Sequence, residues 1–295
     1  MPKSDSGPTV SLVLGSGGAR GLAHIGVIRW LEEHGYRIRS VVGCSMGALV
    51  GGVHAAGKLD EYERWARAIT MVEVVSLIDL SWNRAGLVKG DRVIGTLTEL
   101  VGQARIEDLP IPFTAVACEL PEQKEVWIRS GPLFDAIRAS ISLPMFFTPV
   151  ERNGAKLVDG GVLNPVPIAP TFGDETELTV AVNLGGAVDG SHEIERRAPA
   201  PSAEADSLRD HVDRFISRLR ETVGNRRDDD WSAYDIAHQA FDAMQGTIAR
   251  LKLAAYPPDV TVEIPRNACG LMEFDRAEEM IALGYERAAR SLGRR

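Results

Sequence analysis

The sequence contains little cysteine and no long hydrophobic segment. Its three cysteines, Cys44, Cys118 and Cys269, are far apart in a chain of 295 residues, so they form neither a disulfide framework nor a metal-ligand cluster. We therefore expect reduced thiols, as in a cytoplasmic protein. No apolar run reaches the length of a transmembrane helix, and residues 1–8 do not resemble a signal peptide.

The chain also lacks an excess of positive charge. Lysine and arginine number 33 against 41 aspartates and glutamates, which gives a net charge of −8 at pH 7. An acidic chain is poorly suited to binding nucleic acid, although a local apolar or basic patch is sufficient for peripheral contact with a membrane. No group of ligand-type residues indicates a metal, and we expect no cofactor.

Apolar residues repeat along the chain with the periods of strands and of helices. Strands are predicted at residues 9–14, 39–42, 112–118, 124–128, 156–158, 178–184 and 260–264. Helices are predicted at residues 21–34, 48–56, 60–70, 90–101, 133–141, 208–223, 231–253 and 276–292. Because strands and helices alternate over the first half, the sequence predicts an α/β fold built on a mostly parallel sheet.

A change in composition divides the chain. Residues 1–8 are expected to be a flexible tail and residues 9–185 the core, while residues 186–206, rich in Gly, Ala, Pro, Ser and Glu, are expected to be a flexible linker or loop. Residues 207–295 are predicted to hold a helical hairpin, a late strand and a closing helix. We expect the hairpin to pack on the core; a dimer interface or a membrane-facing lid is the alternative.

Ser45 stands in the pentapeptide Gly43-Cys44-Ser45-Met46-Gly47, between an apolar strand and a helix of small residues. In such a nucleophile elbow a sharp turn raises the hydroxyl above the sheet, and the helix N-terminus faces a developing oxyanion. The pentapeptide alone also arises by chance in a glycine-rich chain, so the interpretation depends on the flanking strand and helix. Ser45 is therefore the candidate nucleophile of a serine hydrolase.

A glycine-rich turn, Gly15-Ser16-Gly17-Gly18-Ala19-Arg20-Gly21, joins the first strand to the first helix. A dinucleotide site would have glycine where Arg20 stands, and no phosphate-binding loop of the Walker type occurs in the chain. The pattern favours an oxyanion hole, in which Gly17 and Gly18 present N–H groups to the adduct formed on Ser45. Arg20 is expected either to brace this loop or to meet a substrate phosphate.

Asp159 ends an apolar strand and precedes two glycines. Taken alone, the Asp-Gly-Gly stretch is typical of a surface turn in which the carboxylate caps the backbone. No histidine has the context of a triad member: His192 lies in the predicted linker, His211 and His238 lie on the predicted C-terminal helices, and His24 and His54 precede the acid. Asp159 is therefore the candidate base. Because an ordinary aspartate is a weak base for an alcohol, burial is expected to raise its pKa, or else the oxyanion site must supply most of the catalysis.

Several stretches together resemble bacterial patatin-like phospholipases. They are GSGGARGLAHIG at 15–26, GCSMGALVGG at 43–52, GLVKGDR at 86–92, ASISLP at 139–144 and LVDGGVLNPVP at 157–167, in the order typical of the family. Ser16 stands where the family often has glycine. The resemblance implies a three-layer sandwich with helices on both faces of the sheet, and a catalytic dyad of Ser45 and Asp159.

The resemblance also implies an oxyanion hole from Gly17, Gly18, Arg20 and the Met46 N–H, and fatty-acyl esters such as phospholipids or lysophospholipids as substrates. The expected activity is that of a phospholipase A, lysophospholipase or carboxylesterase without a metal. A catalytically silent lipid-binding or regulatory scaffold is the alternative, because a fold does not guarantee a function. A nucleotide-binding enzyme is a third alternative.

Overall fold

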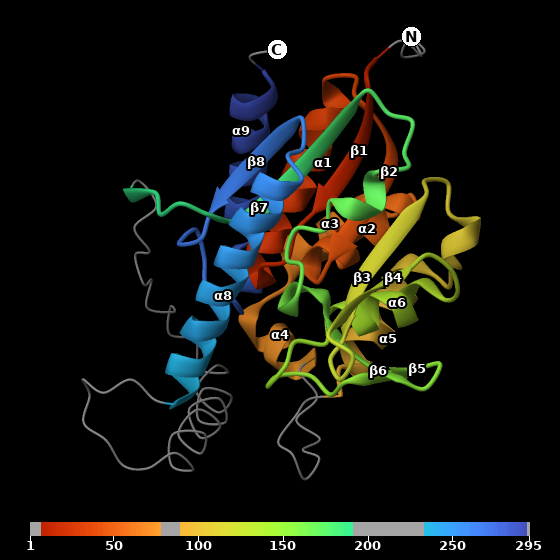
Figure 1. The fold of residues 1–295 in the computed structure, drawn as a ribbon, viewed down its shortest axis with the longest axis vertical. Coiled ribbons are helices and arrows are strands. Elements are labelled where there is room, and N and C mark those ends of the chain that lie inside the picture. Colours follow the sequence, from red (N-terminus) through yellow and green to blue (C-terminus); the bar gives the residue numbers. More distant parts are fainter. Residues whose placement is uncertain (1–6, 78–88, 191–232, 294–295) are drawn as a thin grey trace.

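The structure, a computed structural model of the chain, describes residues 7–77, 89–190 and 233–293. Its centre is an eight-stranded sheet (Figure 1). The strands are β1 Thr9–Leu14, β2 Arg37–Cys44, β3 Phe113–Glu119, β4 Lys124–Ile128, β5 Val150–Arg152, β6 Ala155–Asp159, β7 Leu178–Gly186 and β8 Val260–Pro265. Every predicted strand is present, and β5 is a further strand that the sequence pattern did not indicate.

Five neighbouring strands run parallel in the order β3-β2-β1-β7-β8, and β4, β5 and β6 add an antiparallel extension around β3. Almost every residue of β1 and β3 is buried. Strands that are covered on both faces need apolar residues at consecutive positions, which explains their unbroken hydrophobic runs. The predicted α/β fold with a mostly parallel sheet is confirmed.

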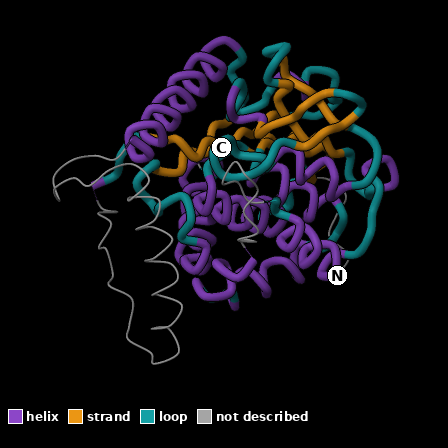
Figure 2. Tube along the Cα trace, turned by 90° about the horizontal axis from the view of Figure 1, so that it is seen from below, coloured by secondary structure: helices purple, strands orange, loops and turns teal. Residues whose placement is uncertain are grey.

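Helices cover both faces of this sheet. They are α1 Ala23–Glu33, α2 Met46–Ala55, α3 Leu59–Ala68, α4 Met71–Leu77, α5 Asp91–Val101, α6 Leu133–Ser140, α8 Ala233–Ala255 and α9 Ala277–Leu292. Leu12 and Leu14 of β1 join the main core with α1, α2 and α9, whereas Val13 joins a smaller cluster with Ala249 and Leu253 of α8. Because neighbouring residues of a strand point to opposite faces, α8 lies on the face opposite α1 and α9 (Figure 2).

The C-terminal residues complete this core. β8 pairs with β7, and α9 packs along α1, so both elements extend the layers that the first half of the chain begins. α8 is the second helix of the predicted hairpin; the first, at 208–223, lies outside the described residues, as does most of the predicted linker. The division of the chain at 186–206 stays a prediction. No helix in the described ranges has both the length and the apolar character needed to cross a bilayer.

Glycines allow α1 and α9 to approach closely. An ideal Cβ on Gly284 would lie 1.9 Å from the Ala23 carbonyl oxygen, and one on Gly26 would lie 1.9 Å from the Ile281 carbonyl oxygen. Real side chains do not tolerate such distances, so any residue larger than glycine must push the two helices apart.

We therefore predict that Gly284→Ala lowers the free energy of unfolding by about 1–3 kcal/mol, because the added methyl group overpacks the α1–α9 contact. Gly95→Ala in α5 is the matched control, since no atom lies within 4 Å of its ideal Cβ. There the better helix former should raise stability by up to about 1 kcal/mol. Urea denaturation of both variants measures the difference, and equal stabilities would contradict the close contact.

Candidate active site

Ser45 lies on the turn between β2 and α2, with the positive φ that is typical of a nucleophile elbow. Its φ is 56° and its ψ is −124°, a conformation that costs free energy for a residue with a side chain. The flanking glycines make room for the turn: an ideal Cβ on Gly47 would lie 2.0 Å from the Leu14 carbonyl oxygen. The Ser45 N–H donates to Ser140 Oγ over 2.9 Å, and Ser140 Oγ donates to the Val116 carbonyl over 2.6 Å.

Sheet pairing brings Asp159 to Ser45. β2 runs parallel to β3 and β6 runs antiparallel to it, and the two strands share one edge of β3 while β4 takes the other edge. Cys44 pairs with Val116, and Asp159 pairs with Ala117, the next residue of β3. The carboxyl ends of β2 and β6 therefore meet head to head, although they are more than a hundred residues apart in sequence.

The Asp159 carboxyl group is fully buried. Its Oδ1 accepts a hydrogen bond from the Gly161 N–H over 2.8 Å and a longer one from the Cys44 thiol over 3.7 Å. Burial raises the pKa of Asp159 to about 6, against the opposing effects of the nearby Ser45 hydroxyl, the Gly161 N–H and the Cys44 thiol. Asp159 thus caps a backbone turn, as the Asp-Gly-Gly pattern indicated, but in the interior rather than at the surface.

The contact between the two candidate residues is loose. The Ser45 hydroxyl is near enough to the carboxylate to hold the pKa of Asp159 down, yet Asp159 Oδ2 forms no hydrogen bond of normal geometry within the described residues. Hydrogen bonds between a nucleophile and its base are often long in the absence of substrate, so this geometry is compatible with proton transfer.

The glycine-rich turn offers two unused backbone donors. The N–H groups of Gly15, Ser16 and Ala19 donate to the carbonyls of Val182, Pro165 and Leu271. Within the described part of the chain, the N–H groups of Gly17 and Gly18 have no acceptor, and both glycines line a pocket together with Ser45. The Met46 N–H, in the first turn of α2, is also without an intrahelical acceptor, as in every helix.

Arg20 braces the glycine-rich turn. Its Nε donates to the Gly17 carbonyl over 3.1 Å, and its Nη1 donates to the Arg266 carbonyl over 2.7 Å. Holding the Gly17 carbonyl in this way fixes the peptide unit that also carries the Gly18 N–H. Of the two roles expected from the sequence, the structure supports the brace, and Arg20 also lines a pocket beside Ser45.

No histidine whose side chain the structure describes forms a hydrogen bond with Ser45 or Asp159. His24 contacts the Gly15 carbonyl through Nε2 over 2.9 Å, and burial lowers its pKa to about 4. Burial also lowers the pKa of His54 to about 4. His34 contacts the Trp30 carbonyl. His192, His211 and the side chain of His238 lie outside the described residues.

Two pockets meet at Ser45. An almost entirely apolar pocket is lined by Gly18, Leu22, Ser45, Met46, Leu49, Tyr62, Trp65, Ala66, Ile69, Val74, Leu77, Val93, Leu97, Ile141, Leu143, Phe146, Phe147, Leu271, Met272 and Phe274. A more polar pocket is lined by Ser16, Gly17, Gly18, Arg20, Ser45, Leu143, Pro144, Met145, Phe146, Ala237, Phe241, Asp242, Gln245 and Leu271. Ser45 lines both pockets, so one of its neighbouring cavities is apolar and the other is more polar.

Two polar residues of this region had no assigned role in the sequence interpretation. Ser140 supports the elbow, and its position in the ASISLP stretch was the one available signal. Gln245 of α8 lines the polar pocket. The sequence places it on a helix, but only the packing of α8 shows which way that side of the helix faces.

A serine on a tight strand-to-helix turn, with a buried carboxylate and free N–H groups beside it, is the arrangement of a serine hydrolase. Comparisons with known proteins give the family. A family model described as "Patatin-like phospholipase" matches residues 12–172. The chain belongs to the patatin-like phospholipase family, whose class of chemistry is lipid acyl hydrolysis.

Individual relatives agree with this membership. An uncharacterized NTE family protein of Mycobacterium tuberculosis is 38% identical, over 98% of this chain and 93% of its own. Lysophospholipase NTE1 of Saccharomyces cerevisiae is 31% identical over 62% of this chain, which corresponds to 11% of the yeast protein. VipD from Legionella pneumophila has a TM-score of 0.47 and 14% identity, over 98% of this chain and 67% of its own, a likeness too weak to bear on the fold.

The buried carboxyl group predicts a pH-dependent stability. Because the pKa of Asp159 is raised from 3.8 to about 6, the folded chain holds its proton more tightly than the unfolded chain, and stability falls as the pH rises through this range. Relative to Asp159→Asn, the wild-type protein should lose about 2 kcal/mol of unfolding free energy between about pH 4 and about pH 8. Denaturation of both proteins across this range measures the loss, and a constant difference would contradict it.

Proposed function

We propose that the protein is a serine lipid acyl hydrolase of the phospholipase A, lysophospholipase or carboxylesterase type, with Ser45 as nucleophile and Asp159 as general base. The observation that carries the proposal is the meeting of β2 and β6 along β3, which leaves a buried carboxylate of raised pKa beside an elbow serine. A carboxylate with a pKa near 6 is a stronger base than an ordinary aspartate, yet it is still ionised at neutral pH.

In the acylation step, Ser45 Oγ bonds to the ester carbonyl carbon while Asp159 accepts the hydroxyl proton. The N–H groups of Gly17, Gly18 and Met46 stabilise the oxyanion, and each such donor typically contributes about 3 kcal/mol in the transition state. The intermediate then breaks its bond to the leaving oxygen, which takes the proton from Asp159. Water next attacks the acyl-enzyme with Asp159 again accepting the proton, and Ser45 recovers it as the acid departs.

The apolar pocket supports a fatty acyl chain as the part of the substrate bound beside Ser45. Residues of α2, α3, α4 and α5 form one part of its wall, and burial of each methylene there contributes about 0.8 kcal/mol. The polar pocket on the other side of Ser45 would take the alcohol or head group. The fungal relatives named lysophospholipase support lysophospholipids, which carry one acyl chain, as the substrate class.

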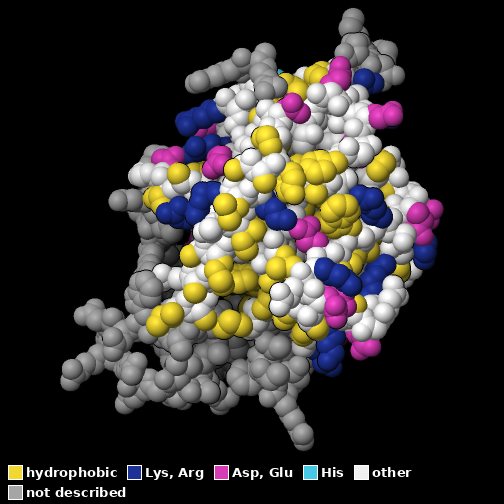
Figure 3. Space-filling model, viewed as in Figure 1, with side chains coloured by type: hydrophobic (Ala, Val, Ile, Leu, Met, Phe, Trp, Pro, Cys, Tyr) yellow, Lys and Arg dark blue, Asp and Glu magenta, His cyan; other side chains and the backbone are white. Residues whose placement is uncertain are grey.

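Exposed apolar side chains support peripheral contact with a lipid surface. Ile236, Met244 and Leu251 of α8 and Met145 beside the polar pocket are more than half exposed. Figure 3 shows hydrophobic side chains gathered on the face that carries α8. An apolar patch next to the substrate pockets would let the enzyme draw a lipid from a membrane without crossing it.

Turnover of a short-chain nitrophenyl ester and labelling by a fluorophosphonate test the dyad. Ser45→Ala should lose both, because the nucleophile is gone. Asp159→Asn should fold and lower turnover about a thousandfold, because general-base assistance is lost. In the wild type, kcat/KM should rise with pH and level off above about 6, as the carboxyl group of Asp159 ionises.

Asp174→Asn is the matched control, since this carboxylate accepts hydrogen bonds from Ser11 and Ser40 away from Ser45. A wild-type rate in Asp159→Asn, together with a loss in His24→Asn, would overturn the dyad. Lipid binding without any labelling of Ser45 would favour the catalytically silent scaffold instead.

The apolar pocket predicts chain-length selectivity. Val93→Phe adds volume to its wall, so kcat/KM for a long-chain lysophospholipid should fall about tenfold while that for an acetyl ester stays within about twofold. Val72→Phe is the control, because Val72 is exposed on α4 and does not line the pocket. An equal fall for long and short chains would exclude this pocket as the acyl site.

A further inference from the structure

Gln245 is directed toward the active site by the face of α8 that it shares with two anchored residues. Gln245, Ala249 and Leu253 follow one another at intervals of four residues, which places them on one side of the helix. Ala249 is 3% exposed and packs with Leu253 against the sheet, so Gln245 faces the same way one turn earlier. The packing of Ala249 and Leu253 therefore turns the helix face that carries Gln245 toward the sheet.

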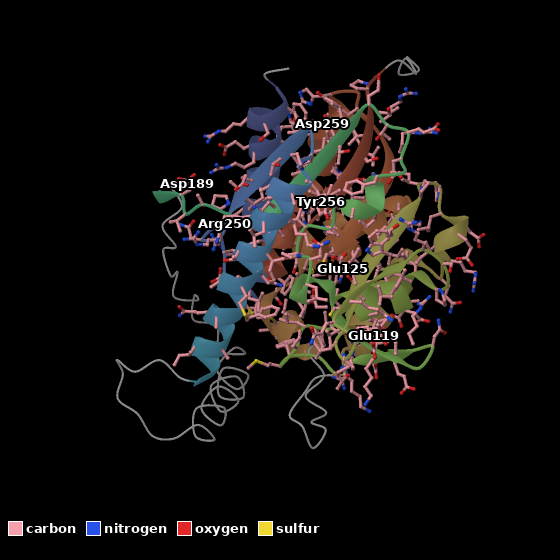
Figure 4. The ribbon with its side chains drawn as sticks, in the orientation of Figure 1. Glu119, Glu125, Asp189, Arg250, Tyr256 and Asp259 are labelled. Carbon is pink, nitrogen blue, oxygen red and sulfur yellow. The ribbon has the colours of Figure 1, made fainter. Side chains whose placement is uncertain are left out.

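A charged contact holds α8 in this orientation. Lys252 Nζ donates to Glu125 Oε1 over 2.9 Å, and Asn164 donates to the other carboxylate oxygen of Glu125 over 3.0 Å. Glu125 and Arg250 lie on opposite sides of α8 (Figure 4), so the helix has one face toward the strands and one toward solvent.

The Gln245 amide nitrogen and the Asp159 carboxylate both lie close to Gly161. An ideal Cβ on Gly161 would lie 2.4 Å from Gln245 Nε2, 2.8 Å from Ser16 Oγ and 3.0 Å from Asp159 Oδ1, so these three groups converge around Gly161. Glycine at position 161 is what allows the amide to come this close.

This amide nitrogen has no hydrogen-bond partner within the described residues, although it is shielded from solvent. Leaving a buried donor unpaired typically costs about 1–3 kcal/mol, so its presence needs a physical reason. Gln245 also lines the polar pocket with Ser45 and Arg20, on the side of the serine away from the acyl pocket. The Gln245 amide nitrogen is therefore an unused hydrogen-bond donor in a residue that lines the polar pocket.

We propose that Gln245 Nε2 donates a hydrogen bond to the oxygen that exchanges a proton with Asp159, an inference that rests on the proposed function. During acylation this is the ester oxygen of the leaving alcohol: its bond to the acyl carbon breaks, and the proton from Asp159 moves onto it. During deacylation the attacking water occupies the same position and gives its proton to Asp159. One amide would therefore stabilise the leaving alkoxide in the first step and orient water in the second.

Two butyrate esters that share the acyl group and differ in the alcohol test this role. A nitrophenolate departs without a proton, whereas an alkoxide leaving from an ethyl ester needs both the proton and the donor. Gln245→Met keeps the length of the side chain and removes the donor. It should lower kcat/KM for ethyl butyrate about 10- to 100-fold and leave kcat/KM for nitrophenyl butyrate and the rate of fluorophosphonate labelling within about twofold.

Gln239→Met is the matched control, because Gln239 is exposed on the same helix and does not line the pocket. It should leave both esters unchanged. Equal falls for the two esters in Gln245→Met would show a merely structural role, and no fall for either would show that the amide does not contact the leaving oxygen; both results overturn the inference. A wild-type protein that hydrolyses neither ester would instead count against the proposed function itself.

Discussion

The candidate site depends on the meeting of two strand ends along one edge of β3. β2 and β6 approach from opposite directions and stop at consecutive β3 residues, Val116 and Ala117, which sets Ser45 beside Asp159. Backbone hydrogen bonds hold both strands in place, so the sheet fixes the positions from which the two side chains start. Such preorganisation would suit the proposed roles of nucleophile and base, because little reorganisation would be needed during reaction.

The same meeting creates the electrostatic character of the site. The Asp159 carboxyl group is fully buried, and its removal from water raises its pKa toward neutrality. Stability and activity are therefore opposed at this residue, since the ionised form that can accept a proton is the form that burial penalises. The strained backbone of Ser45 is a second cost to stability. The strand before the turn and the helix after it hold Ser45 in this conformation.

The local patterns were sufficient for much of this structure. The alternation of strands and helices predicted the α/β fold, and the glycine pattern around Ser45 predicted the elbow because that turn needs glycines on both sides. The lack of a well-placed histidine made Asp159 the candidate base. Ser140 and Gln245 were out of reach, because a serine or a glutamine in a helical segment has no local feature that indicates which distant backbone or carboxylate it meets.

The sequence by itself determined the elements and the chemical groups: an elbow serine, a glycine-rich turn and an aspartate at the end of a strand. Those features are local, since a turn or a strand depends on neighbouring residues and their periodicity. Only the tertiary structure decided that β2 and β6 meet on one edge of β3, that Arg20 braces Gly17, and that Gln245 of α8 lines the pocket beside Ser45. Contacts between residues so far apart along the chain follow from strand pairing and helix packing, which no short stretch of sequence encodes.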